Sequence, residues 1–157
     1  MIALTNDPTI TARIWMETIW SRRDLTRFEE LHAPHFVDHS PSGRRSDRES
    51  YKLGIVELFE AFPDFRATTE DLIADCEAGR VAIRWSAAAT HLGPFMGRPA
   101  SGLIVDFRGI EVIQIDGGRL VERWGEWDGI GLLEQISRAA NLPPNEPNFT
   151  CTTTPDR

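Results

Sequence analysis

Residues 103–127 read LIVDFRGIEVIQIDGGRLVERWGEW, and this stretch decides the fold class. Its centre, Asp116-Gly117-Gly118, is a hairpin turn of the Asp-Gly type, because such turns need residues that tolerate a positive φ. The flanking runs are rich in the β-branched and aromatic residues that are typical of strands. The stretch therefore predicts two antiparallel strands, over 103–115 and 120–127, joined by a tight turn.

Two further strand-like runs precede this hairpin. Residues 65–73 and 81–91 have strand composition, and the polar residues 75–79 between them form a turn. A loop rich in Gly and Pro then leads to residue 103. The second half of the chain is thus predicted to be a meander of four antiparallel strands.

The first half of the chain has helical spacing instead. Apolar residues recur every three or four positions, and Asp or Ser residues stand where helices begin. Prolines keep residues 32–41 extended. The predicted helices cover residues 8–22, 24–31, 47–61 and 129–138.

This order of elements indicates an α+β fold. Helices that are segregated from antiparallel strands pack on one face of the sheet. We expect a strongly curved sheet whose N-terminal helices, 8–22 and 47–61, lie across it and enclose a deep pocket. Residues 1–140 form one domain in this prediction, and residues 141–157, rich in Pro, Asn and Thr, form an extended mobile tail.

Composition narrows the class of partners. Hydrophobic residues make up 41% and charged residues 26%, which is typical of a globular domain. The net charge of −7 argues against nucleic acid or an anionic membrane surface as a partner. The start of the chain does not resemble a signal peptide, and no apolar run is long enough for a membrane span, so we expect a cytoplasmic location. Cys76 and Cys151 are expected to be free thiols.

Four segments resemble the SnoaL-like polyketide cyclases, of the ester cyclase type, in the NTF2-like superfamily. In chain order they are HFVDH at 35–39, AFPDF at 61–65, THLGPFMGRP at 90–99 and DGGRLVERWGEWD at 116–128. The resemblance spans roughly residues 8–138. Each segment alone is a weak signal, and the resemblance rests on all four occurring in the same order as in the family. It implies a cone-shaped fold with a buried pocket, no metal or organic cofactor, and a homodimer.

The resemblance also implies ring closure by acid/base chemistry. In the family, an Asp takes a proton alpha to a carbonyl and returns it to the new alkoxide, and a His polarises the substrate. Counted back from the hairpin, the Asp position falls on Gly125 and the His position on Glu111. Glu126 is the nearest carboxylate, but neighbours in a strand face opposite ways unless a bulge re-aims one of them.

Three other polar residues are candidates for proton transfer. Asp38 and His39 are adjacent in an extended segment, so at most one should face the pocket, and either can instead bond the local backbone. Glu111 stands among apolar residues. Burial would raise its pKa and make it a usable base, whereas on the outer face it would pair with an arginine. We predict Asp38 and Glu111 as the proton-transfer groups, His39 and Arg123 as polarising or orienting groups, and Glu126 as the alternative base.

A second set of residues should contact the substrate. Arg123 can hold an enolate or carboxylate through two parallel hydrogen bonds, whereas Arg84 is expected on the solvated outer face. Trp124 and Trp127 have opposite parity, so one of them should line the pocket or a dimer interface. His91 either braces the loop beside it or acts on the substrate. The predicted substrate-binding residues are Arg123, Trp85, Trp127, His91 and Phe59.

These signals predict a cofactor-independent cyclase or isomerase that acts on a small, apolar, carbonyl-bearing substrate of polyketide type. Aldol, pyran-forming and epoxide-opening ring closures all suit its carboxylates. The alternative is a non-catalytic ligand-binding or interaction protein, which Gly125 at the family's Asp position favours. No metal-ligand spacing, P-loop or dinucleotide fingerprint is present, so neither a metal nor a cofactor is expected. We expect a homodimer through the outer sheet face, since the strands carry apolar residues on both parities.

Overall fold

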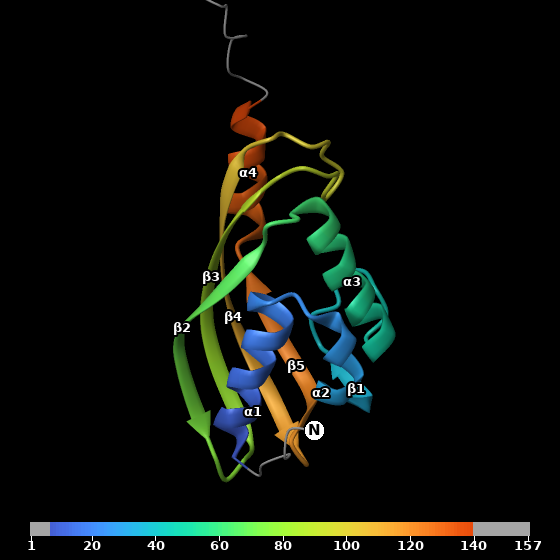
Figure 1. Ribbon diagram of the computed structural model, residues 1–157, viewed down its shortest axis with the longest axis vertical. Coiled ribbons are helices and arrows are strands. Elements are labelled where there is room, and N and C mark those ends of the chain that lie inside the picture. Colours follow the sequence, from blue (N-terminus) through green and yellow to red (C-terminus); the bar gives the residue numbers. More distant parts are fainter. Residues whose placement is uncertain (1–6, 140–157) are drawn as a thin grey trace, which may run out of the picture.

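A five-stranded sheet organises residues 7–139, the part of the chain that this computed structural model describes (Figure 1). The strand order is β1-β5-β4-β3-β2. Strands β2 to β5 form the predicted antiparallel meander, whereas β1 pairs with β5 in parallel, which the sequence pattern did not show. The strands are β1 His32–Asp38, β2 Arg66–Asp75, β3 Arg80–Thr90, β4 Ile104–Asp116 and β5 Arg119–Trp127.

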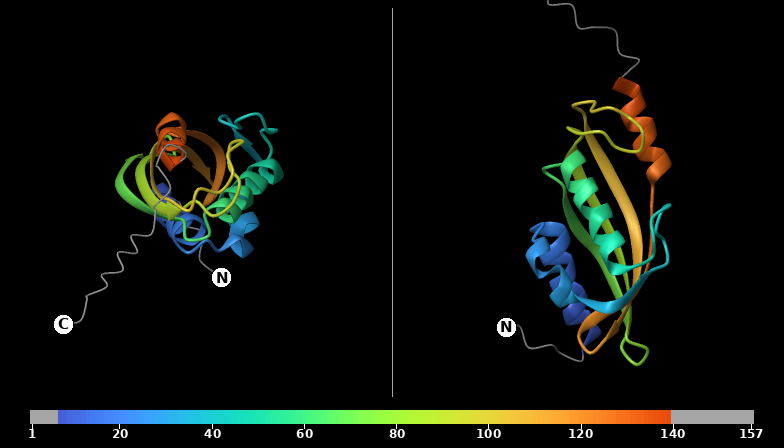
Figure 2. Two further views of the ribbon diagram at one scale, coloured as in Figure 1. Left: turned by 90° about the horizontal axis from the view of Figure 1, so that it is seen from above. Right: turned by 90° about the vertical axis from the view of Figure 1, so that its right-hand side faces the viewer.

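The helices begin close to the predicted capping residues. The side chains of Asp24, Asp47 and Asp128 accept hydrogen bonds from backbone N–H groups of the turns that they start. Figure 2 shows α1 and α3 on the same side of the sheet, as predicted. The helical segments are α1 Pro8–Trp15, continued by a π-helical turn Met16–Ser21, a 3-10 turn Leu25–Arg27, α2 Phe28–Leu31, α3 Arg48–Ala61 and α4 Gly129–Ala139.

Alternation along β4 separates the two faces of the sheet. Its odd-numbered residues Val105, Phe107, Glu111 and Ile113 are all buried, and the even-numbered residues are exposed or half-buried. The buried face meets α1 and α3, so the apolar core lies between the sheet and these helices. Glu111 is thus the one ionisable residue on the inner face of β4.

A β-bulge in β5 decides which of its residues face the helices. Gln114 pairs with Glu122, but Ile115 pairs with Leu120, so Val121 is an extra residue in this strand. Leu120 and Arg123 are consequently both buried, although strict alternation would place them on opposite faces. Beyond the bulge Arg123 faces inward and its even-numbered neighbours face outward.

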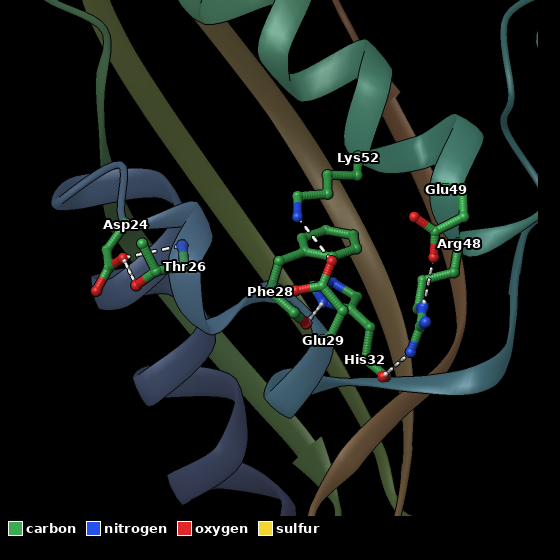
Figure 3. A network of polar contacts seen from close by, with 8 residues as sticks. All are labelled: Asp24, Thr26, Phe28, Glu29, His32, Arg48, Glu49 and Lys52. Carbon is green, nitrogen blue, oxygen red and sulfur yellow. Dashed lines mark hydrogen bonds and ion pairs between the residues drawn. The ribbon is translucent and has the colours of Figure 1, made fainter.

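Polar contacts fix the junction of α2, β1 and α3 (Figure 3). His32 is fully buried, its Nδ1 donates to the carbonyl of Phe28 at 2.8 Å, and its Nε2 accepts from Trp15 Nε1 at 3.1 Å. This pairing requires a neutral ring, and burial lowers the pKa of His32 to about 4. Lys52 of α3 donates to Glu29 of α2 at 2.7 Å. These contacts anchor the start of β1, the strand that carries Asp38.

Some predictions fall beyond this part of the chain. The tail at 141–157 and Cys151 lie outside the described residues, whereas Cys76 is described as a free, exposed thiol. Within residues 7–139, no helix combines the length and the apolar character that crossing a membrane requires. The cytoplasmic location stays a prediction.

Candidate functional site

A pocket of about 460 Å³ lies between the inner face of the sheet and the helices. Buried residues such as Tyr51, Phe107 and Glu111 form its floor, and the exposed residues Glu57 and Met96 belong to its rim. Most lining side chains are aromatic or aliphatic. Those that carry polar groups are Trp20, Ser40, Ser42, Arg44, Tyr51, Glu57, Trp85, Glu111, Arg123 and Trp127.

The centre of the floor is a buried cluster of two carboxylates and one guanidinium. Arg123 Nη1 donates to Asp38 Oδ1 at 2.8 Å, and its Nη2 donates to Glu111 Oε1 at 3.1 Å. Arg123 Nε also lies 2.6 Å from Glu111 Oε2, in an ion pair whose angle is poor for a hydrogen bond. Asp38, Glu111 and Arg123 are 1%, 4% and 8% exposed. Guanidinium and carboxylates thus neutralise one another away from water, as buried charges must.

Strand register brings these three residues together. The parallel pairing of β1 with β5 sets Asp38 opposite Arg123, and the antiparallel pairing of β4 with β5 sets Glu111 opposite Gly125. Arg123 is two residues from Gly125, so both lie on the inner face beside Glu111. Asp38 does not itself line the pocket, because it lies behind Arg123.

Gly125 provides the space for this cluster. A Cβ at this position would collide with the guanidinium of Arg123 and with Oε2 of Glu111. The ends of two side chains therefore occupy the volume that a residue at 125 would fill. The position that the resemblance assigns to the family's Asp has no side chain, but a carboxylate from the neighbouring strand lies directly over it.

Burial shifts the proton affinities of two groups on the floor, Glu111 and Tyr51. Burial raises the pKa of Glu111 above its ordinary value, and the charge and hydrogen bond of Arg123 and the indole N–H of Trp85 offset part of this rise. Tyr51 lies beside the cluster, with the Arg123 guanidinium 4.9 Å from its ring centroid. Its hydroxyl is buried and has no hydrogen-bond partner within residues 7–139, and burial raises its pKa, so it stays protonated.

Comparison with known proteins agrees with this geometry. The family profile described as SnoaL-like polyketide cyclase matches residues 10–136. The chain belongs to the SnoaL-like polyketide cyclase family. Its α+β fold with a curved, unclosed sheet is the NTF2-like fold that the resemblance implied. A search of curated proteins found no match.

Several solved structures of similar fold have more than 25% sequence identity to this chain. IdmH of Streptomyces antibioticus, described as a candidate polyketide cyclase, is 28% identical with a TM-score of 0.71, covering 83% of this chain and 98% of its own. AclR of Streptomyces galilaeus, described as a candidate hydroxylase, is 27% identical with a TM-score of 0.72, covering 87% and 97%. A candidate polyketide cyclase of Acidithiobacillus ferrooxidans is 26% identical with a TM-score of 0.72, covering 88% and 99%.

Besides Asp38, two more of the predicted catalytic residues do not line the pocket. His39 Nε2 bonds Glu122 Oε2 at 2.7 Å on the outer side of the sheet, and its ring stacks on Trp124 at 4.6 Å between centroids. Glu126 is exposed and lies 3.4 Å from the hydroxyl of Ser40. The bulge in β5 comes before Arg123 and turns that residue inward, which leaves Glu126 facing away. Neither His39 nor Glu126 lines the pocket.

The predicted substrate-binding residues divide in the same way. Trp85, Trp127 and Arg123 line the pocket. Phe59 is buried in the core against Trp20, and the pocket does not reach it. His91 is fully buried as well, and its Nδ1 accepts from the backbone N–H of Ser101 at 3.2 Å, so it braces the Gly/Pro loop.

The structure also shows where the other residues with two interpretations lie. Trp127 is the inward member of the tryptophan pair, and Trp124 is the outward one. Arg84 pairs with Asp71 on the outer face, where both side chains are more than half exposed. Asp128 caps α4. No group of three His, Cys, Asp or Glu side chains within residues 7–139 could hold a metal ion.

Sequence reasoning missed Tyr51, Ser40 and Arg44 as parts of this site. The helical spacing of residues 47–61 does not separate Tyr51 from residues that only pack in the core, although a buried tyrosine hydroxyl usually finds a hydrogen-bond partner. Ser40 and Arg44 follow β1 in a loop, where periodicity provides no signal. The alternation of β4, in contrast, could have placed Glu111 inward, since Phe107, Ile113 and it share one parity.

Proposed function

We propose that this family member closes a ring in a carbonyl-bearing substrate of polyketide type by acid/base catalysis, without a cofactor. The observation that carries the proposal is the buried Glu111 carboxylate, which lines the pocket over Gly125. A pocket of about 460 Å³ with mainly apolar walls suits a small flat molecule.

Glu111 is the base in this mechanism. Its Oε2 lacks an aligned hydrogen bond and can therefore accept a proton from the carbon alpha to a substrate carbonyl. Burial raises the pKa of Glu111, which makes its carboxylate a stronger base, and Arg123 keeps the carboxylate form accessible. The same carboxyl then returns the proton to the alkoxide that ring closure forms.

Tyr51 is the electrophilic partner. Its buried hydroxyl has no partner within residues 7–139 and lines the same pocket, so it can donate a hydrogen bond to the substrate oxygen as negative charge develops there. The charge of Arg123, close to the Tyr51 ring, adds to this stabilisation. Asp38 lies behind Arg123, and we assign it the role of holding the guanidinium in place rather than moving protons.

Exchange of substrate protons with solvent tests the base directly. We expect the wild-type protein to accelerate deuterium uptake from heavy water at the alpha carbon of an aryl β-keto ester, followed by NMR. Glu111→Gln should lower this rate about 100-fold or more, the usual scale for a general base. Tyr51→Phe should also lower it, whereas Glu126→Gln, on the outer face, is the matched control and should leave it unchanged. Equal rates for Glu111→Gln and the wild type would refute the assignment.

Binding without catalysis is the second candidate function. The observation that favours it is that Arg123 contacts both buried carboxylates, as a purely structural cluster would. A wild-type protein that binds such esters without accelerating exchange would support this reading.

We also propose that two copies pair through the outer sheet face. Ile73 and Ile110 are 71% and 54% exposed there. Strand register places Ile73, Ala82, Val112 and Trp124 in one row across that face. An apolar row of this length would be covered in a homodimer.

A further inference from the structure

Arg44 occupies an unusual position at the pocket rim. Its side chain is 35% exposed and lines the pocket, and its Nε is buried without a hydrogen-bond partner among the described residues. Its nearest acidic group is Glu57, whose Oε2 lies 3.9 Å from Nη1, and the Glu57 side chain is 54% exposed. Among the described residues, Arg44 is therefore paired only with Glu57, at the limit of ion-pair distance and through a carboxylate that is largely open to solvent.

Gly54 holds this guanidinium against α3. A Cβ at Gly54 would lie 2.5 Å from Arg44 Cζ and 2.7 Å from its Nε. Glycine inside a helix costs about 1 kcal/mol relative to alanine, and the helical backbone at residue 54 does not require it. The absence of a side chain at Gly54 thus leaves room for the Arg44 guanidinium to pack against the helix.

The two arginines of the pocket differ in what they can offer a ligand. Arg123 on the floor contacts both Asp38 and Glu111, so its charge is compensated. Arg44 has only the distant, exposed carboxylate of Glu57 beside it, and its Nε has no hydrogen-bond partner among the described residues. Tyr51 and Gly54 are three residues apart on α3 and thus share a helix face. Arg44, which packs against Gly54, is therefore on the same side of α3 as the residue that provides the proposed catalytic hydroxyl.

We propose that Arg44 binds a carboxylate of the substrate at the pocket rim, so that the substrate class is an acidic aromatic polyketide. A planar guanidinium matches a carboxylate through paired, charge-assisted hydrogen bonds. The carboxylate then fixes which end of the molecule reaches the floor. The part of this inference that concerns the reacting end rests on the proposed function, whereas carboxylate binding stands independently of catalysis.

A matched pair of probes tests the proposal without knowledge of the substrate. Anthraquinone-2-carboxylate and its carboxamide share one apolar body and differ in charge. Their binding can be followed through quenching of the pocket tryptophans Trp20, Trp85 and Trp127. We expect the wild-type protein to prefer the carboxylate about 10-fold, the lower end for hydrogen bonds to charged groups. Arg44→Gln should abolish the preference, and Arg84→Gln, on the outer face, should keep it.

Gly54→Ala separates a binding role from a structural one. The added methyl displaces the guanidinium while the helix gains a better helix former, so the melting temperature should rise by about 2 °C as the carboxylate preference falls. If Arg44 only stabilised the fold, Gly54→Ala would lower the melting temperature and leave the preference intact.

The failure of this proposal differs from failure of the proposed catalysis. A wild-type protein that shows no preference, whether because it binds both probes equally or neither, overturns the carboxylate site. That result leaves the Glu111 exchange assay untouched. Conversely, loss of exchange in Glu111→Gln with an unchanged carboxylate preference supports both assignments, since it separates base from anchor.

Discussion

The Arg123→Met substitution removes the guanidinium between Asp38 and Glu111 but keeps an unbranched side chain in its place. Asp38 is 1% and Glu111 4% exposed, so both carboxylates would stay buried without a counter-charge. Removing one partner of a buried pair costs about 3–5 kcal/mol, and two stranded carboxylates put the expected loss near the upper end, about 5 kcal/mol. For a domain of this size that loss lowers the melting temperature by about 10–20 °C.

The loss should depend on pH in a defined direction. Without Arg123, burial raises the folded-state pKa of Glu111 above its unfolded value with no guanidinium to offset the rise, so the folded variant binds more protons than the unfolded chain. Its stability relative to the wild type therefore recovers as pH falls from neutral toward about 4. Asp38→Asn and Glu111→Gln, added to Arg123→Met, should recover much of the loss at neutral pH.

Urea-induced unfolding, monitored by tryptophan fluorescence at several pH values, measures the free energy of unfolding of each variant. Arg22→Met is the matched control, because the Arg22–Glu17 pair lies outside the strands and has side chains that are 72% and 56% exposed. It should cost no more than about 1 kcal/mol. If Arg123→Met were as stable as Arg22→Met, or if its deficit were the same at about pH 5 as at neutral pH, the description of a buried charge cluster would be incorrect.

Three more predictions test other parts of the molecule. Gly125→Ala should lose about 1–3 kcal/mol of unfolding free energy and most exchange activity, because its Cβ collides with the Arg123–Glu111 pair; an unchanged urea midpoint would contradict this. His32 has a folded pKa of about 4, below its unfolded value of 6.5, so the stability that its neutral ring provides is present above pH 6.5 and lost as pH falls through 4. The loss should approach about 3 kcal/mol and be smaller in His32→Gln, which urea titrations across that range can check. Light scattering at micromolar concentration should give a dimer mass for the wild type and a monomer mass for Ile110→Asp, whereas a monomeric wild type would remove the outer-face interface.

Much of the fold could be predicted because its signals are local. The Asp-Gly turn at 116–117, the capping aspartates and the apolar spacing of the helices each act within a few residues. The structure has the predicted helices and antiparallel strands within a few residues of their expected bounds. The four segments that carried the family resemblance are local as well, and the family match over residues 10–136 confirms them.

The site could be predicted only in part. Glu111 and Arg123 were identified as polar residues in apolar strands, and both line the pocket. His39 was identified in an extended segment and Glu126 as the carboxylate nearest the family's Asp position, and both lie on the other side of the sheet. Which face of the sheet each of these side chains is on depends on strand register. A polar residue within an apolar run does not reveal that register.

The sequence by itself therefore determined the helices and strands, their order, and the presence of charged residues within apolar strands. Tertiary structure decided which charges meet. The bulge at Val121 turns Arg123 inward, and the parallel pairing of β1 with β5 places Asp38 behind it. Gly125 then leaves room for the carboxylate of Glu111, which comes from the adjacent strand. Each of these depends on pairing between residues distant in the chain, and a one-residue change of register would move every side chain of a strand to the opposite face.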